Sequence, residues 1–362
     1  MSNHLQVCYF PYLFLENRET VEFDEITVWN FSILKSQRIT DGKIRNHVTQ
    51  LPEANQRNGK PIKDMGLISI KNKKDFTPFR DIEQKKIDDL RKVLFLCSVA
   101  RSNIYQGPNV AHRMFTSDNF TVVYQNFKID DPYIAYQSGR IIPIHNVGYK
   151  IGEINYEAPR HVLRRIFTFD EELLNALKKI KRKRSTMYRR ILRATDAMMS
   201  GYTNSDDVSH ESRILEQSRA FEILFDLPDT SQREELKKYI AQYFQGNKER
   251  KMRYTSERSH GKRVWETNTR HVMWADRFYT LRNHIIHGEQ LKNTEFSFLR
   301  QPHYHLGLWF FIASVKKILN DTFGKNIFYD TIRYKSGQFE YDNCLIIRAI
   351  DRALSKSKMF TN

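Results

Sequence analysis

The amino-acid sequence predicts an α+β protein, with a β-rich N-terminal half and an all-α C-terminal half. Up to about residue 160, apolar and polar residues alternate in short runs, which is the pattern of half-buried strands. After Pro159 the apolar residues recur every three or four positions, as they do along the buried side of a helix. The chain has 362 residues, 40% of them hydrophobic, and is long enough for two cores. We expect domains at residues 1–160 and 161–362.

In the N-terminal domain, short apolar runs bounded by turn residues predict strands. The clearest is Val21–Trp29, where apolar and polar residues alternate. The other predicted strands are Val7–Phe10, Tyr12–Leu15, Val93–Ala100, Phe120–Tyr124, Tyr133–Tyr136 and Arg140–Ile144. The polar stretch Arg45–Lys74 predicts a long loop, and Asp81–Lys92 predicts a short helix. No catalytic constellation is visible here, which favours a recognition or sensing module.

In the C-terminal domain, apolar residues at helical spacing predict an all-α unit of about six helices. The first helix begins at the capping sequence Thr168–Glu172, and a basic polar loop is expected at Gly246–Lys262. Gly288 follows a helix at the position where a left-handed C-cap is expected. The helical segments are Leu173–Ile180, Met187–Met199, Glu211–Leu227, Glu234–Phe244, Thr267–His287, His305–Phe323 and Asn343–Leu354.

The charge of the chain is unevenly distributed. Lys and Arg number 59 against 42 Asp and Glu, which gives a net charge of +17. Residues 161–362 hold 37 basic and 24 acidic residues, whereas residues 1–160 hold 22 and 18. A positive field of this kind attracts polyanions, of which nucleic acid is the commonest and an anionic membrane surface the next. The alternative is that the charge serves only solubility.

Other broad classes of protein are not indicated. No stretch approaches the roughly 18 consecutive apolar residues that a membrane span needs. The N-terminal sequence lacks the pattern of a signal peptide. Three widely spaced cysteines indicate neither a disulfide framework nor a zinc ribbon. We therefore expect a cytoplasmic protein that needs no cofactor.

The sequence Arg282-Asn283-His284-Ile285-Ile286-His287 has the residue types that RNA cleavage requires. RNA carries its own nucleophile, the 2′-OH, so the protein must supply a group that exchanges protons near neutral pH, such as His287. Arg282 could stabilise the negative charge of the developing phosphorane, and Asn283 could orient the phosphate or the imidazole. Arg282 and His287 are about 140° apart around a helix, so Arg282 must reach around or a second chain must complete the site. A surface Arg followed by a capping His is the alternative interpretation.

These residues resemble the R-x4-6-H motif of the HEPN superfamily, and Tyr279 with the closing His-Gly is similar to its Apea-like branch. Ser218–Phe225 and Leu308–Leu319 resemble the helices that flank the motif in that branch, so the resemblance covers roughly residues 165–325. It implies a helical bundle that forms a homodimer with two motifs facing across a cleft. It further implies metal-independent endoribonuclease activity in anti-phage defence or a toxin system. Arg282 and His287 would then be catalytic and Asn283 their polar assistant.

Two further residues have a supporting role in this hypothesis. Glu222 lies among apolar residues and could hold Arg282 in place, although an ordinary charge at a helix edge has the same pattern. His284 could be a second catalytic imidazole or a polar residue on a solvated or dimer face. A zinc site built from His284, His287, His303 and His305 is a further alternative. It is disfavoured because Arg282 would repel the cation.

Two basic runs favour RNA as the partner. Residues 178–193 contain nine Lys and Arg, and residues 248–263 contain seven, with Tyr254 inside the second run and Trp265 just after it. Such residues bind a phosphate backbone, and the aromatic rings could stack on bases. A solvated helix face and an unstructured loop are the alternative. The residues predicted to bind RNA are Lys181, Arg182, Lys183, Arg184, Arg189, Arg190, Lys251 and Arg253.

Two other functions remain open from the sequence. The protein could bind RNA without cutting it, with the helical domain serving only dimerisation and the N-terminal domain sensing. It could also be a toxin that a partner protein, such as a nucleotidyltransferase, inhibits or triggers.

Overall fold

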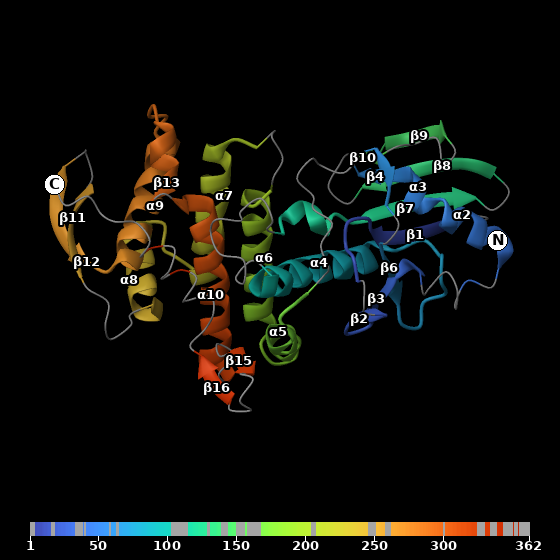
Figure 1. The fold of residues 1–362 in the computed structure, drawn as a ribbon, viewed down its shortest axis with the longest axis horizontal. Coiled ribbons are helices and arrows are strands. Elements are labelled where there is room, and N and C mark those ends of the chain that lie inside the picture. Colours follow the sequence, from blue (N-terminus) through green and yellow to red (C-terminus); the bar gives the residue numbers. More distant parts are fainter. Residues whose placement is uncertain are drawn as a thin grey trace. The chain divides into compact units, whose positions relative to one another are not determined.

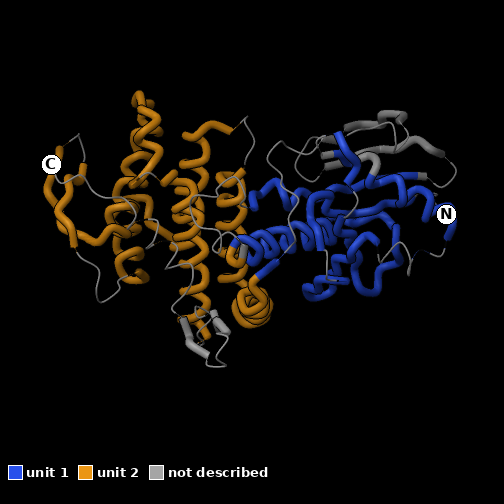
Figure 2. The backbone as a smooth tube through the Cα atoms, viewed as in Figure 1, with its two compact units in different colours: residues 1–99, 115–169 blue, residues 100–114, 170–362 orange. Residues whose placement is uncertain are grey.

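The structure is a computed structural model, and everything below concerns the residues whose placement it describes. Those residues are 4–15, 19–32, 39, 41–57, 59–62, 65–102, 115–128, 131–138, 144–149, 156–157, 168–203, 208–244, 251–257, 262–299, 301–323, 330–333, 339–342, 350 and 354. The chain forms two compact units (Figure 2). Unit 1 comprises residues 1–99 and 115–169, and unit 2 comprises residues 100–114 and 170–362. The predicted α+β class is confirmed (Figure 1).

Unit 1 is built on an antiparallel sheet. Its strand order is β2-β3-β6-β1-β7-β8-β9. The strands are β1 His4–Phe10, β2 Thr20–Phe23, β3 Ile26–Asn30, β6 Gly66–Ile70, β7 Val123–Lys128, β8 Asp131–Ser138 and β9 Ile144–Tyr149. A Cβ on Gly66 would lie 2.7 Å from Val28 Cγ1, so the close approach of β6 to β3 requires glycine there.

Helices cover both faces of this sheet. Val7 and Tyr9 on β1 join an apolar cluster with Val48 of α2 (Gly42–Thr49) and Leu51 of α3 (Leu51–Ala54). Cys8 points to the opposite face because successive strand residues alternate. There it pairs in register with Tyr124, which borders a hollow shared with α4 (Asp81–Ser102). Small elements complete the unit: β4 Asn55–Arg57, β5 Lys60–Pro61, β10 Tyr156–Glu157 and the 3-10 helix η2 Ser117–Phe120.

Several predicted elements of unit 1 are wrong. Val93–Ala100 is helical, the second half of α4, because a helix buried on every side has the same continuous apolar run as a buried strand. Val21–Trp29 is a hairpin rather than one strand, since Asp24 takes a left-handed φ of 54° and turns the chain. Arg45–Lys74 is not a loop, because it contains β6, an interior strand of the sheet. Of Tyr12–Leu15 only Phe14 forms a bridge.

Six of the seven predicted helical segments are present in unit 2, with ends shifted by a few residues. The described helices are α5 Glu171–Lys183, α6 Ser185–Gly201, α7 His210–Phe225, α8 Gln232–Phe244, α9 Arg270–Ile286 and α10 His303–Phe323. Asp170 caps α5 by accepting the Leu173 N–H at 2.9 Å, so the predicted capping sequence is used as expected. Short strands and one 3-10 helix complete the described part: η5 Asn293–Phe296, β13 Ser297–Phe298, β14 Gln301–Pro302, β15 Asp330–Arg333 and β16 Phe339–Asp342.

An aromatic cluster joins three of these helices. Phe221 of α7 lies 6.0 Å from Trp274 of α9 and 6.0 Å from Phe311 of α10, between ring centroids. Trp274 also stacks on Phe310 at 4.1 Å. Trp274 is fully buried, and so is Trp309, the neighbour of Phe310 in the sequence. Burial of rings this large stabilises the packing of α7, α9 and α10, and therefore fixes the position of the α9 end.

Unit 2 is not all-α. The segment predicted as a basic loop contains the hairpin of β11 Met252–Glu257 and β12 Arg263–Asn268. Tyr254 and Ser256 are buried while Arg253 is exposed, so the strand does alternate at period two. The charged residues on its outer face hide this pattern in the sequence.

Some predictions fall outside the described residues. They are most of Arg140–Ile144 and of Asn343–Leu354, and the basic residues Lys248, Arg250 and Arg258 of the predicted basic loop.

Candidate functional site

The C-terminal end of α9 is held in a defined conformation. The N–H of Glu289 donates to the His284 carbonyl at 3.0 Å, and that of Gly288 donates to the Ile285 carbonyl at 3.1 Å. Gly288 has a φ of 70°, the left-handed value that this type of helix cap needs. The predicted left-handed cap at Gly288 is thus confirmed. It fixes His287 as the C-cap residue, one position beyond the last helical residue.

The four polar residues of the motif line one hollow in unit 2. The hollow has a volume of about 820 Å³. Arg282, Asn283, His284 and His287 all border it, although Arg282 and His287 are five residues apart. Although the two residues are about 140° apart around the helix, both side chains reach this one hollow without a second chain. The rest of its lining is Asp229, Ser231, Gln232, Arg233, Glu234, Glu257, Tyr279, Thr280 and Glu289.

Arg282 is held by three neighbours. Its guanidinium pairs with Glu222 of α7 at 3.3 Å, donates to the Asn283 side-chain oxygen at 3.1 Å and lies 5.1 Å from the Tyr279 ring centre. The Tyr279 hydroxyl donates to the same Glu222 carboxylate at 2.7 Å and also contacts Gln232. Burial, together with this bond to Glu222, raises the pKa of Tyr279 far above its usual value, so the phenol stays protonated. Glu222 is therefore an ion-pair partner of Arg282. This is the first of the two interpretations of Glu222 that the sequence allowed, the other being an ordinary charge at a helix edge.

The two histidines of the motif have different surroundings. His284 Nε2 lies 3.1 Å from the Glu257 carboxylate of β11, and its Nδ1 lies 3.7 Å from Glu289. The His287 side chain is exposed at the edge of the hollow and pairs with none of the described residues. His287 is thus the imidazole with free access to a ligand, whereas His284 is tied to the hairpin.

A buried network of charges fixes the hairpin against α8 and α9. Asp276 of α9 is fully buried and pairs with Arg233 at 2.7 Å and with Lys237 at 3.2 Å. Lys237 also pairs with Glu266 of β12 at 2.9 Å, and Arg233 donates to the Glu257 carbonyl. Burial alone would lower the pKa of Lys237, but the bond to Glu266 and the nearby carboxylates raise it above its usual value. These contacts hold Glu257 at the hollow.

The other two histidines of the alternative zinc site lie elsewhere. His303 is buried beside Phe278 and Phe298, and His305 is buried with its Nδ1 3.1 Å from the Tyr202 hydroxyl. Burial lowers the pKa of both imidazoles to about 3. Within the described ranges, His, Cys, Asp and Glu form no cluster of three or more suited to a metal ion.

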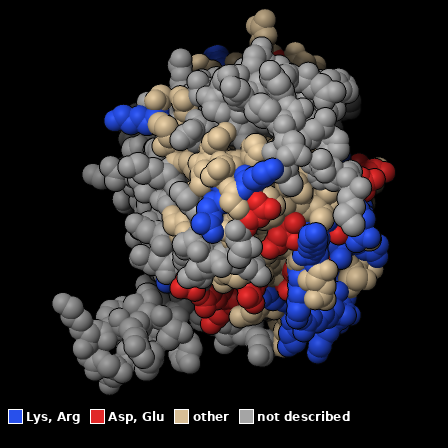
Figure 3. All heavy atoms as spheres, turned by 90° about the vertical axis from the view of Figure 1, so that its right-hand side faces the viewer, with Lys and Arg blue, Asp and Glu red and all other residues tan. Residues whose placement is uncertain are grey.

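The predicted RNA-binding residues lie on two separate parts of unit 2. Six are at the end of α5 and on α6: Lys181, Arg182, Lys183, Arg184, Arg189 and Arg190. Arg190 pairs with Asp226 at 3.5 Å, and none of the six borders the hollow. Lys251 and Arg253 are exposed at the hairpin. On the face shown in Figure 3, basic side chains gather in one dense patch, and acidic side chains lie beside it.

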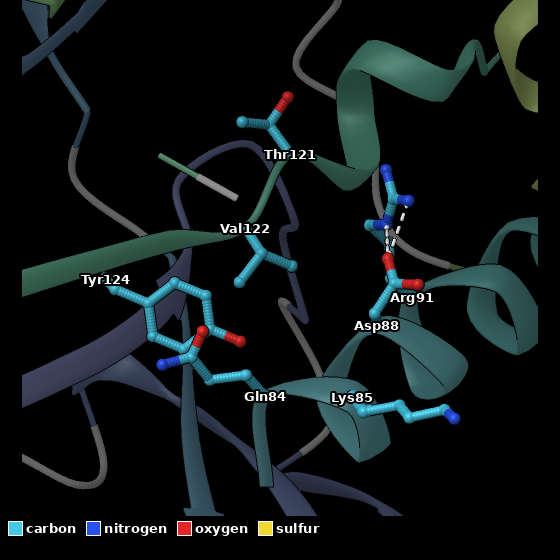
Figure 4. A pocket seen from close by; sticks show the side chains of 7 residues that line it. All are labelled: Gln84, Lys85, Asp88, Arg91, Thr121, Val122 and Tyr124. Carbon is cyan, nitrogen blue, oxygen red and sulfur yellow. Dashed lines mark hydrogen bonds and ion pairs between the residues drawn. The ribbon is translucent and has the colours of Figure 1, made fainter. Parts of the chain in front are cut away.

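Unit 1 contains a second hollow, of about 230 Å³ (Figure 4). Asp88 in its wall pairs with Arg91 at 2.7 Å and with Lys92 at 2.6 Å, which lowers the Asp88 pKa despite burial. The other lining residues are Gln84, Lys85, Thr121, Val122 and Tyr124. With Asp88 and Arg91 paired to each other and no histidine in the lining, this hollow lacks the imidazole that the larger one offers for proton transfer.

Sequence reasoning missed the residues that α8 and β11 contribute to the site, above all Gln232, Arg233 and Glu257. The alternation of buried Tyr254 and Ser256 was the available signal for the strand that carries Glu257.

The chain matches no protein-family model, and no curated protein or solved structure is significantly similar to it.

Proposed function

We propose that this protein is a metal-independent endoribonuclease of the HEPN type that cuts RNA in the hollow at the end of α9. The observation that carries the proposal is that Arg282, Asn283 and His287 of one chain border the same hollow. A guanidinium, an amide and an unpaired imidazole are the groups that cleavage by the 2′-OH needs.

The reaction uses the RNA's own nucleophile. The 2′-oxygen forms a bond to phosphorus, the bond from phosphorus to the 5′-oxygen breaks, and the 2′-OH proton leaves as the 5′-oxygen gains one. His287 acts as the general acid or base in this exchange. Arg282 contacts the non-bridging oxygens as negative charge builds up on them, and Asn283 orients the guanidinium through their 3.1 Å hydrogen bond.

Carboxylates in and around the hollow compete with the RNA phosphate for the basic side chains of the motif. Asp229, Glu234, Glu257 and Glu289 border the hollow together with Arg233 and Arg282. Since Glu222 and Glu257 already pair with Arg282 and His284, a phosphate must compete with these carboxylates for the two side chains. This pairing is also the specific observation that favours a second candidate function, RNA binding without cleavage.

The test is cleavage of total RNA and tRNA in excess EDTA by the wild-type protein and by the Arg282→Ala and His287→Ala variants. We expect cleavage by the wild type and a loss of at least about 100-fold in each variant. Folding is checked by circular dichroism. Salt-sensitive binding with no cleaved product would favour the second candidate, and cleavage unaffected by either change would refute the proposal.

We further propose a homodimer in which two such hollows face each other, working in the cytoplasm in anti-phage defence or as a toxin that a partner protein restrains. Ile286, next to His287, is 51% exposed, which suits a contact with a second copy. Sedimentation should give twice the chain mass of 43.2 kDa, and Ile286→Lys should shift the protein to a monomer. A wild-type monomer at every concentration would exclude the dimer.

Among the described helices, none has the length and apolar character to cross a bilayer.

A further inference from the structure

The outer face of the β11–β12 hairpin has a composition unlike its inner face. Tyr254 and Ser256 point inward and are buried. Because strand residues alternate, Arg253 and Thr255 of β11 point outward, as does Trp265, which lies opposite Thr255. The exposed basic residues of this hairpin region are Lys251, Arg253, Lys262 and Arg263.

Trp265 is the most exposed tryptophan of the chain. It is 64% accessible, whereas Trp274 and Trp309 are buried and Trp29 is partly buried. The Arg253 guanidinium lies 4.5 Å from the centre of its ring, diagonally across the hairpin. An open indole beside a guanidinium and further cations is the combination on which unpaired bases stack, with the phosphates held by the charges.

This face leads directly to the candidate site. Trp265 lies opposite Thr255, which is two residues before Glu257, or about 7 Å along the strand. Glu257 borders the hollow and binds His284. The pairs of Lys237 with Glu266 and of Arg233 with Asp276 hold the hairpin to the helices that form the hollow. A base on Trp265 therefore belongs to a nucleotide close to the one in the hollow.

We propose that the Trp265–Arg253 face binds an unpaired base of single-stranded RNA next to the phosphate in the hollow. The inference rests on the proposed function and names its substrate class. Single strands are favoured over duplexes because a paired base is stacked between its neighbours and cannot offer its ring to the indole. Arg253 and Arg263 contact the flanking phosphates.

The test is binding to the full-length His287→Ala variant, so that cleavage does not interfere. A labelled unstructured oligoribonucleotide is added alone or annealed to its complement, and fluorescence anisotropy and tryptophan emission are recorded. We expect the single strand to quench the emission of the exposed Trp265 and to bind more tightly than the duplex. Trp265→Leu should abolish this quenching and weaken single-strand binding roughly 10-fold.

Two control variants make the result specific. Trp265→Phe keeps an aromatic ring and should retain most of the affinity, and Thr267→Ala alters the same exposed strand face and should change nothing. Unchanged affinity in Trp265→Leu, or equal binding of single strand and duplex, would overturn the inference. Quenching without cleavage by the wild-type protein would refute only the proposed function, so the two failures are distinguishable.

Discussion

Replacing Glu222 by Gln isolates the role of the ion pair behind the motif. The amide keeps an oxygen that can accept from the Tyr279 hydroxyl, now 2.7 Å from the carboxylate, but it removes the charge that holds Arg282 at 3.3 Å. If Glu222 is a positioning residue, the guanidinium loses its fixed direction while its own charge remains.

The magnitude follows from the exposure of the pair. The two side chains are 21% and 20% accessible, so the contact lies between a surface pair, worth about 0.2–1 kcal/mol, and a buried one, whose disruption costs about 3–5 kcal/mol. We expect a loss of about 1.4 kcal/mol of transition-state stabilisation, which is about 10-fold in kcat. KM should not rise, because the substitution removes a negative charge from the neighbourhood of a bound phosphate.

The assay is steady-state cleavage of a defined oligoribonucleotide in EDTA, with kcat and KM determined separately. Glu216→Gln is the matched control, since it makes the same chemical change on the same helix in a surface pair with Arg219. That variant should behave as the wild type. An unchanged kcat in Glu222→Gln, or a loss confined to KM, would refute a positioning role for Glu222.

Two further predictions concern stability. Because burial lowers the pKa of His303 and His305 to about 3, the unfolded chain binds their protons below about pH 6.5 and the folded chain does not. The free energy of unfolding at neutral pH is therefore reduced as the pH falls, by about 1.4 kcal/mol per pH unit for each imidazole. His303→Phe should reduce this dependence of the free energy of unfolding on pH, measured by urea unfolding at pH 6 and pH 5. Asp276→Asn removes a charge that both the buried Lys237 and the partly buried Arg233 contact. It should lower the free energy of unfolding by about 3 kcal/mol, measured by the same method at pH 7.

Each of these has a clear contrary result. A slope between pH 6 and pH 5 that is the same in the wild type and in His303→Phe would show that this imidazole is not kept neutral by burial. An Asp276→Asn protein within about 0.5 kcal/mol of the wild type would show that the network does not fix the hairpin.

The sequence predicted helix α9 and its end well because local signals determine both. Apolar residues at helical spacing run up to the motif, and Gly288 supplies the left-handed residue that closes the cap. Helix Arg270–Ile286 was predicted as Thr267–His287, and such shifts of a few residues at helix ends are usual.

The sequence failed where tertiary surroundings decide the structure. The run Val93–Ala100 is buried on every side, so it carries no periodicity that distinguishes helix from strand. The hairpin β11–β12 was read as a loop because Arg253, Glu257 and Arg263 dominate its exposed face. Its link to the site depends on Asp276, a single buried carboxylate in an apolar helix, whose partners come from other elements.

The hollow itself could not be predicted, since its walls come from three elements. Spacing on a helix separates Arg282 from His287, and both border the hollow because it also extends over α8 and β11. Glu222, from α7, lies beside Arg282 because Phe221 packs against Trp274 and so holds α7 against α9.

The chemical ends of the RNA products test the central claim most directly. Wild-type protein and His287→Ala are incubated with a defined single-stranded RNA in EDTA, and the products are analysed by mass spectrometry. Attack by the 2′-OH predicts a 2′,3′-cyclic phosphate on one fragment and a 5′-hydroxyl on the other, with neither formed by His287→Ala. Fragments that carry a 5′-phosphate, or identical products from the variant, would contradict cleavage by these residues.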